Sequence, residues 1–292
     1  GRPGRFSEIR SMLAYGGNLT GFSVVNYFAR NLDDVLIGRF HGAGPLGLYQ
    51  KAYEILMVPI KQINNPVSAV AIPALSRLVD QPERYRKAYL RILEKVLLLT
   101  MPLAALLIAT ADWVVLLALG PQWTESAQIF AVLGILVFIQ PLGNSTGWLF
   151  ITQDRTREML RWGVLGSTLS IISFLVGLPW GVIGVAAAYA ISGLVVRTPI
   201  LLWYVGRRGP VRTVDFYKRC APFALSGVVT LGVLLQMRAL EVVTHPAAGL
   251  AIALALTLVT MPTVLAIFPG GRDAMRDAMA IATRLAARRG SR

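Results

Sequence analysis

The sequence predicts an all-α, polytopic bundle of transmembrane helices. Hydrophobic residues make up 55% of the 292 residues and charged residues only 15%, and the mean hydropathy is +0.58. A soluble domain has about 45–50% apolar and about 25% charged residues. A helix needs about 20 mainly apolar residues to cross a bilayer, and the chain holds enough apolar sequence for about eight such crossings. A soluble globular protein is therefore excluded.

Apolar runs between turn residues and charges give the individual spans. They lie at 11–32, 44–72, 88–111, 125–151, 160–178, 181–204, 220–237 and 247–268. Because their number is even, both termini are expected on the same side of the membrane.

The basic residues decide which side that is. Twenty-three of the 29 Lys and Arg residues lie before the first span, in every second connection or at the span ends beside it, and in the tail, whereas the stretches 112–124 and 179–180 contain none. Cytoplasmic loops carry the excess of Lys and Arg, so both termini are predicted to be cytoplasmic. The net charge of +14 then reports topology and contact with anionic phospholipids, and nucleic acid is not an expected partner.

Two further segments outside the spans have their own expectations. The longest connection, 73–87, is predicted as a helical elbow at the membrane interface. The tail can form an amphipathic helix on the inner leaflet, with a frayed basic tail as the alternative. Its apolar side would hold Met275, Met279, Ala282 and Leu285, and its basic side Arg272, Arg276, Arg284 and Arg288.

Charged and amide side chains interrupt the first two spans. A charge at the centre of a bilayer costs about 2.5–3.5 kcal/mol, so such residues should face a cavity or a partner. Lys51, Glu54 and Lys61 share one helical face with Asn65. This face is expected to line a hydrated passage, with a structural seam or local Lys51–Glu54 pairing as the alternative.

Other polar residues lie in or near the spans, and most of them have two possible roles. Arg30 with Asp33 and Asp34 either forms an ion pair or meets a ligand or a coupling cation. Gln140 and Asn144 in the fourth span are either contacts between helices or contacts to substrate. Arg197 is expected to snorkel to the cytoplasmic interface.

Several chemical functions are not supported. One cysteine, Cys220, and two histidines, His41 and His245, argue against a metal centre, a CxxC redox pair or a disulfide within the chain. The stretch Gly42–Gly47 fits GxGxxG but follows no strand, so it is interpreted as a hairpin turn and not as a dinucleotide site. No enzymatic motif and no cofactor is expected.

Five stretches together resemble one protein family. Residues 28–42 read FARNLDDVLIGRFHG and residues 47–53 read GLYQKAY, which is similar to the N-x-D-x-x-L-I-G … G-x-Y-x-x-A signature of Wzx-type polysaccharide and lipopolysaccharide flippases. These flippases belong to the multidrug/oligosaccharidyl-lipid/polysaccharide exporter superfamily. The other stretches are VAIPALSR at 70–77, LGPQW at 119–123 and LPWGVIGVA at 178–186.

The resemblance implies a domain organisation. Family members have two six-helix lobes around a central cavity, often followed by two extra helices. By this comparison residues 1–10 are a cytoplasmic segment, 11–205 the second six-helix lobe, 206–268 two additional transmembrane helices and 269–292 the basic cytoplasmic tail. The chain is then a fragment whose N-terminal lobe is missing.

The implied function is translocation of polyprenyl-pyrophosphate-linked oligosaccharide across the bacterial inner membrane by alternating access. The alternatives are a cation-coupled multidrug exporter of the same superfamily, a membrane enzyme of glycan assembly, and a scaffold. Cationic and amide side chains suit the diphosphate and the sugar hydroxyls, and carboxylates suit a coupling cation. The expected substrate contacts are Asn26, Arg30, Lys51, Lys61, Gln62, Gln140 and Asn144, and the expected ion-coupling residues are Asp33, Asp34 and Glu54.

Overall fold

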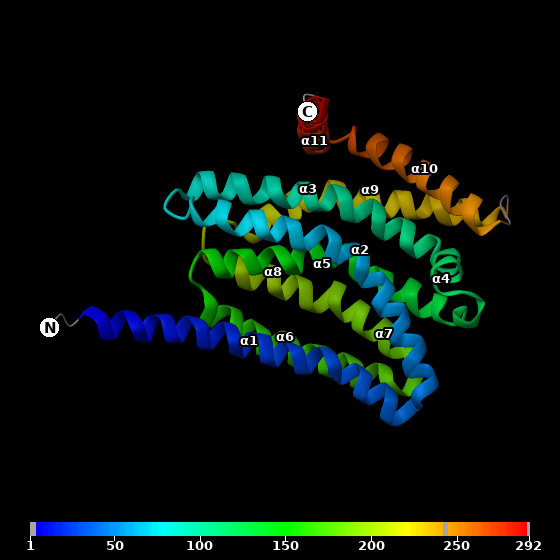
Figure 1. Ribbon diagram of the computed structural model, residues 1–292, viewed down its shortest axis with the longest axis horizontal. Helices are drawn as coiled ribbons and strands as arrows, with labels where there is room; N and C mark the ends of the chain where they lie inside the picture. The colour runs from blue at the N-terminus through cyan, green and yellow to red at the C-terminus, as the bar shows by residue number, and fades with distance from the viewer. Residues whose placement is uncertain (1–3, 242–244, 291–292) are drawn as a thin grey trace.

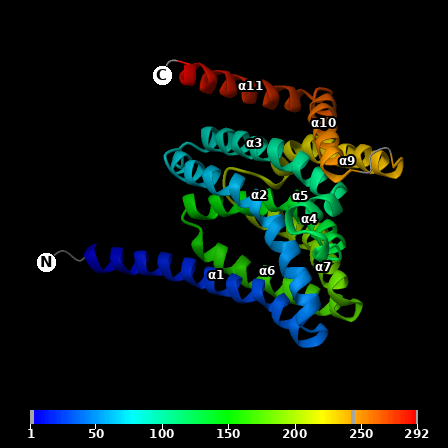
Figure 2. The same cartoon turned by 45° about the vertical axis from the view of Figure 1, so that its right-hand side comes forward.

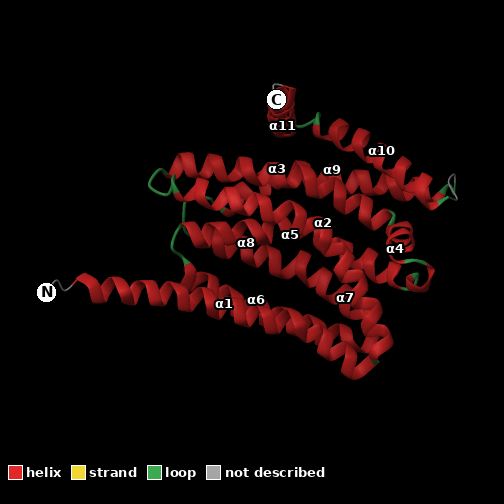
Figure 3. Ribbon diagram, in the orientation of Figure 1, coloured by secondary structure: helices red, strands yellow, loops and turns green. Residues whose placement is uncertain are grey.

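The protein is an all-α membrane bundle. The computed structural model describes residues 4–241 and 245–290, and this part of the chain contains helices and turns but no strand (Figure 3). Side chains are described from residue 12 to 280, apart from 242–244, and at 283. Arg2, Arg5, Arg10 and the tail positions Ala282, Arg284, Leu285 and Arg288 therefore lie outside the described side chains.

The helices follow the expected spans, run further at several ends, break the expected span 88–111 at Thr110 and end short of 268. They are α1 (Gly4–His41), α2 (Ala43–Ser76), α3 (Pro82–Ala109), α4 (Ala111–Leu119), α5 (Ser126–Thr152), α6 (Thr156–Gly177), α7 (Gly181–Ser192), α8 (Thr198–Gly206), α9 (Thr213–Ala239), α10 (Pro246–Leu265) and α11 (Pro269–Gly290). Short 3₁₀ turns, η1 (Pro121–Trp123) and η2 (Leu178–Trp180), precede α5 and α7, and a π-helical segment, η3 (Gly193–Arg197), joins α7 to α8.

Within the part of the chain that the structure describes, five continuous helical stretches are long and apolar enough to cross a membrane. They include Thr156–Gly206, which folds back on itself near η2 and so holds both the fifth and the sixth expected spans (Figure 1). Helices α1 and α2, with 38 and 34 residues, are long enough but are not among the five. Both sequences are too polar to count as apolar spans. The polar residues responsible are the ones that make α1 and α2 candidate site helices.

The helices run between two ends of an elongated bundle. The start of α1 and the turns at 77–81, 153–155 and 207–212 lie at the left end in Figure 1, and the α1–α2 turn at residue 42, η1 and η2 lie at the right end. The predicted cytoplasmic connections thus lie together at the end opposite Gly42, η1 and η2. Helices α10 and α11 lie on the outside of the bundle, beside α9 and α3 (Figure 2).

Helix α5 is the centre of the packing. It contacts α2, α3 and α7, while α1 packs along α6 and α9 packs along α3. Two large apolar clusters result, one that includes Tyr89, Phe150 and Phe216 and one that includes Leu56 and Phe130. The side chains of both clusters pack closely between the helices. Such van der Waals packing is a main force that associates helices in lipid.

The hairpin between α1 and α2 is tighter than expected. The sequence predicts a turn over Gly42–Gly47, but Gly42 alone is non-helical, with φ 88° and ψ 177°. Helix α2 begins at Ala43, so Pro45 lies in its first turn, where the missing N–H breaks no helical bond. The expected elbow over 73–87 is also shorter, because α2 continues to Ser76 and α3 begins at Pro82.

Ion pairs hold the left end of the bundle together. Arg86 of α3 forms a bidentate pair with Asp215 at the start of α9, and Arg219 Nη1 lies 2.8 Å from Glu94 Oε1. Asp215 also accepts a hydrogen bond from the backbone N–H of Arg212, which defines the first turn of α9. Arg86 and Arg219 therefore hold α3 and α9 together, and both belong to the basic residues that mark the predicted cytoplasmic side.

Helix α11 has one side against the bundle. Ala274 is buried and Met275 packs against the neighbouring apolar cluster, whereas Arg272 and Arg276 are exposed. Met279, which the sequence places on the apolar side with Met275, is 61% exposed. Among the described side chains the expected apolar side therefore packs against the bundle at Met275 but not at Met279.

Candidate functional site

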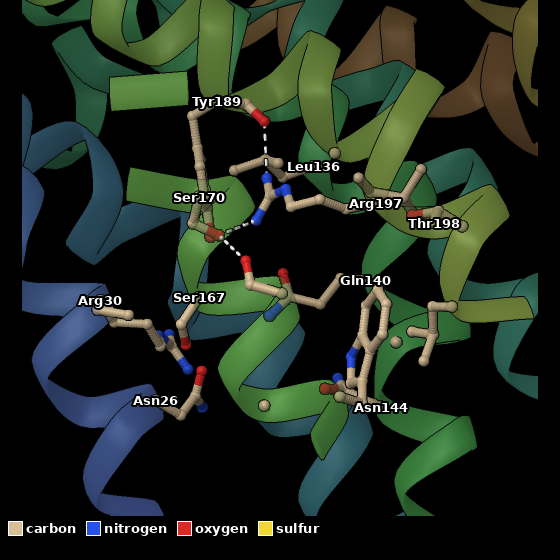
Figure 4. A pocket seen from close by; sticks show the side chains of 18 of the residues that line it. Asn26, Arg30, Leu136, Gln140, Asn144, Ser167, Ser170, Tyr189, Arg197 and Thr198 are labelled. Atoms are coloured by element: carbon tan, nitrogen blue, oxygen red, sulfur yellow. Dashed lines mark hydrogen bonds between the residues drawn. The ribbon is translucent and has the colours of Figure 1, made fainter. Parts of the chain in front are cut away.

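A cavity of about 240 Å³ lies between α1, α5, α6, α7 and α8. Its walls carry an unusual number of polar groups for the interior of a membrane bundle (Figure 4). They are Asn26, Arg30, Tyr53, Gln140, Asn144, Ser167, Ser170, Tyr189, Arg197 and Thr198. We call this space the central cavity.

Arg197 enters the central cavity from the π-helical segment. Its Nη1 donates a hydrogen bond to Ser170 Oγ at 2.7 Å, and its Nη2 donates to the carbonyl of Tyr189 at 2.7 Å (Figure 4). The guanidinium carbon also lies 4.0 Å from the centre of the Tyr189 ring. The expectation that Arg197 snorkels to the interface is therefore wrong, because its guanidinium finds these acceptors inside the bundle.

The backbone at this point makes room for the guanidinium. A Cβ added to Gly193 would lie 3.0 Å from Arg197 Nη2, so a larger residue would crowd the arginine. Single-turn π segments occur frequently at functional sites. The Nε atom of Arg197 is buried and has no hydrogen-bond partner among the described residues.

A second groove of about 660 Å³ opens between α1 and α2. It shares Phe22, Asn26, Arg30 and Tyr53 with the central cavity, so the two spaces adjoin. Arg30 Nη2 donates to Tyr53 Oη at 3.1 Å. Arg30 thus lies at the passage between the two spaces.

The two carboxylates of α1, Asp33 and Asp34, accept hydrogen bonds from residues of α2 and do not pair with Arg30. Tyr49 donates from Oη to Asp33 Oδ2 at 2.7 Å, and Gln50 Nε2 lies 3.1 Å from Asp34 Oδ2. Among the described residues Arg30 forms no ion pair with either aspartate. The ion-pair interpretation of this cluster is wrong, because the α1–α2 hairpin presents hydroxyl and amide donors to each carboxylate.

The expected substrate contacts separate into two groups. Four of them, Asn26, Arg30, Gln140 and Asn144, line the central cavity. The other three, Lys51, Lys61 and Gln62, line neither space; Lys61 and Gln62 are exposed on α2, and Lys51 pairs with Glu54 at 2.8 Å. The expected ion-coupling residues Asp33, Asp34 and Glu54 all line the groove.

Sequence reasoning missed the contribution of α6. Gly163, Gly166, Ser167 and Ser170 line the central cavity from one face of this helix. Their spacing of three and four residues was visible as a stripe of small residues. A Cβ at Gly163 would collide with the ring of Phe22, so the small residues let α1 approach α6 closely and leave space beside them.

Comparisons with known proteins agree with this architecture. Residues 2–128 match the family described as polysaccharide biosynthesis protein. The chain is 26% identical over 208 residues to the lipopolysaccharide biosynthesis protein WzxC of Escherichia coli, covering 70% of this chain and 42% of that protein. It is 29% identical over 159 residues to the teichuronic acid biosynthesis protein TuaB of Bacillus subtilis, covering 54% and 33%. The chain is related to these polysaccharide biosynthesis proteins.

A solved structure shares the fold. The lipid II flippase MurJ in its inward closed conformation matches with a TM-score of 0.69 at 19% identity, covering 87% of this chain and 53% of MurJ. The chain spans less than half the length of the two curated relatives and about half of MurJ. These relatives and the apolar helices make the protein a multi-pass bacterial membrane protein.

Proposed function

We propose that this chain forms the second lobe, with two extra helices, of a transporter that moves polyprenyl-pyrophosphate-linked oligosaccharide from the cytoplasmic to the outer leaflet. One observation carries the proposal: Arg30 and Arg197, from helices far apart in the sequence, line one polar cavity inside an apolar bundle. The relationship to proteins of lipopolysaccharide and teichuronic acid biosynthesis supports the saccharide part of the substrate.

The physical problem for such a substrate is its headgroup. A diphosphate and several sugars must pass about 30 Å of hydrocarbon. Guanidinium groups form strong, charge-assisted hydrogen bonds with phosphate oxygens, and the amides of Asn26, Gln140 and Asn144 suit sugar hydroxyls. The cavity therefore offers both kinds of contact, while the polyprenyl chain stays in the lipid.

The groove between α1 and α2 is the proposed open side of this lobe. In a two-lobe transporter a first lobe would complete the cavity over this groove and over the exposed face of α2. Lys51, Lys61 and Gln62 would then meet substrate only through the completed cavity, and Asp33, Asp34 and Glu54 would meet a coupling cation. The transporter would lie in the bacterial inner membrane, and the two lobes would rock against each other to give alternating access.

The test replaces each cavity arginine in the complete transporter. Arg30→Gln and Arg197→Gln are expressed in a bacterium that lacks its own copy of the gene, and lipid-linked oligosaccharide is measured on each side of the inner membrane. We expect accumulation on the cytoplasmic side at unchanged protein level. Arg39→Gln is the matched control, because Arg39 is an exposed arginine of the same helix and lines neither space.

Normal surface glycan in both cavity variants would contradict the proposal. Drug efflux that continues when the polyprenyl glycan pathway is deleted would instead support the multidrug alternative, which the polysaccharide-related proteins do not favour. An enzyme of glycan assembly would leave altered glycan linkages, and a scaffold would tolerate both arginine replacements.

Eight crossings with both termini in the cytoplasm are the proposed topology. The chain has one cysteine, so Cys220→Ser provides a background for single-cysteine labelling. An impermeant maleimide should label Gln122→Cys in intact spheroplasts and Asp80→Cys only after lysis. Both residues are exposed, and Gln122 lies in η1 and Asp80 in the α2–α3 turn, which are at opposite ends of the bundle. The reverse pattern would invert the topology. The same orientation places the basic connections against anionic phospholipid headgroups.

A further inference from the structure

A separate pocket lies at the end of the bundle that carries Gly42, η1 and η2. It has a volume of about 590 Å³ and lies among the first turns of α2, α5 and α7. This volume is within the range of about 300–1,000 Å³ that small-molecule sites occupy. None of its lining residues belongs to the central cavity or to the groove between α1 and α2.

Trp180 forms an exposed aromatic wall of this pocket. Its residue surface is 72% exposed, although tryptophan buries more apolar area than most side chains when it can. The turn that carries it is fixed from two sides. His41 Nε2 lies 3.0 Å from the carbonyl oxygen of Leu178, and Gly184 packs so closely that an added Cβ would lie 2.5 Å from the Trp180 Cβ. The ring is thus presented on a rigid support.

The polar groups of the pocket carry no positive charge. Glu125, Gln128 and Thr124 line it, and no Lys or Arg does. Glu125 forms no ion pair and Gln128 no side-chain hydrogen bond among the described residues, so both are available to a ligand. A phosphate headgroup would need cationic partners and would be repelled by Glu125.

These features suit a sugar ring. A pyranose has an apolar C–H face, whose positively polarised hydrogens are attracted to the negative face of an indole. It also has a rim of hydroxyl groups that donate to a carboxylate and both donate to and accept from an amide. We propose that this pocket binds a neutral pyranose unit of a saccharide, stacked on Trp180 and hydrogen-bonded by Glu125 and Gln128.

The inference rests on the proposed function only for the source of the saccharide, the glycan that leaves on the outer side. Binding itself needs no transport, and it is measured with the purified full-length protein in phosphatidylcholine nanodiscs, which avoid sugar-based detergents. The probes are the methyl glycosides of glucose, galactose, mannose and N-acetylglucosamine, followed by saturation-transfer NMR.

We expect at least one glycoside to receive saturation mainly at the C–H groups of one ring face. Its dissociation constant should rise at least fivefold in Trp180→Ala and in Gln128→Ala. Trp203→Ala is the matched control, because Trp203 is also exposed but lies near the start of the 207–212 connection, away from the pocket. Its binding should equal that of the wild type.

Two results would overturn the proposal. One is that no glycoside binds, or that binding is the same in Trp180→Ala and in the wild type. The other is that anionic phosphatidylglycerol in the nanodisc abolishes the glycoside signal, which would assign the pocket to lipid headgroups. Sugar binding that depends on Trp180 while Arg30→Gln and Arg197→Gln transport normally would contradict the proposed function and leave this inference standing.

Discussion

Arg197 and Ser170 form a hydrogen bond in the wall of the central cavity, with 2.7 Å between Nη1 and Oγ, although they lie 27 residues apart and on different helices. The serine accepts a hydrogen bond from a charged donor, and such bonds contribute more than neutral ones. Ser170 therefore orients the guanidinium that we assign to the diphosphate.

Removing this acceptor should reduce transport without abolishing it. In Ser170→Ala the carbonyl of Tyr189 still holds Nη2, so we expect a loss of about tenfold, the size of one hydrogen bond to a charged group. The measurement is the rate of appearance of lipid-linked oligosaccharide on the outer leaflet. Thr168→Ala is the control, since Thr168 is exposed on the same helix and bonds only within it. Equal rates in both variants would remove Ser170 from the site.

The lysines of α2 should matter less than the arginines. Lys51 and Lys61 lie outside both spaces, and Lys51 already pairs with Glu54. The double variant Lys51→Gln, Lys61→Gln should lower transport by less than Arg30→Gln does, compared at equal protein levels. A larger loss in the double variant would show that the exposed face of α2 carries the main substrate contacts in the completed transporter.

The hairpin of α6 and α7 should not tolerate a single methyl group at its crossing. A Cβ on Gly177 would overlap the backbone carbonyl of Gly184, which cannot rotate away as a side chain can. We expect Gly177→Ala to cost about 1–3 kcal/mol of stability, the usual range for overpacking. The midpoint of thermal unfolding in detergent provides the measurement.

Gly147→Ala is its control, because an added Cβ there meets no atom within 4 Å. In a helix this change should be neutral or slightly stabilising, since alanine has the higher helix propensity. Equal midpoints for the two variants would mean that the α6–α7 crossing is looser than the structure has it.

The pair of Glu94 and Arg219 should stabilise the contact of α3 with α9. Arg219→Gln leaves a carboxylate whose side chain is only 10% exposed without its partner. Since the arginine itself is half exposed, we expect a loss of about 1–2 kcal/mol, below the cost for a fully buried pair. Lys218→Gln removes a neighbouring exposed charge and should leave the unfolding midpoint unchanged. If both variants unfold alike, the pair contributes nothing.

The helical content, and the placement of the Lys- and Arg-rich connections at one end of the bundle, could be predicted from the sequence alone. Apolar length and the positions of Lys and Arg are properties of the chain in one dimension, and the bilayer turns them directly into helices. The predicted spans accordingly overlap the helices, although the span 88–111 is interrupted at Thr110 and the span 247–268 runs three residues past α10. The basic connections at 77–81, 153–155 and 207–212 lie at one end of the bundle.

The sequence alone could not predict which polar residues line the central cavity. Helical periodicity correctly placed Lys51, Glu54 and Lys61 on one face of α2, but it could not tell which element covers that face. Arg197 appeared isolated in an apolar stretch, and its acceptors come from α6 and α7.

What the sequence by itself determined is therefore the helices and the end of the bundle at which the basic connections lie. The tertiary structure alone decided that Arg30 and Arg197, 167 positions apart, share a cavity while Lys51 and Lys61 do not. The physical reason is that burial of a polar group depends on which neighbouring helix supplies its hydrogen-bond partner, and this follows from packing between segments that are distant in the chain.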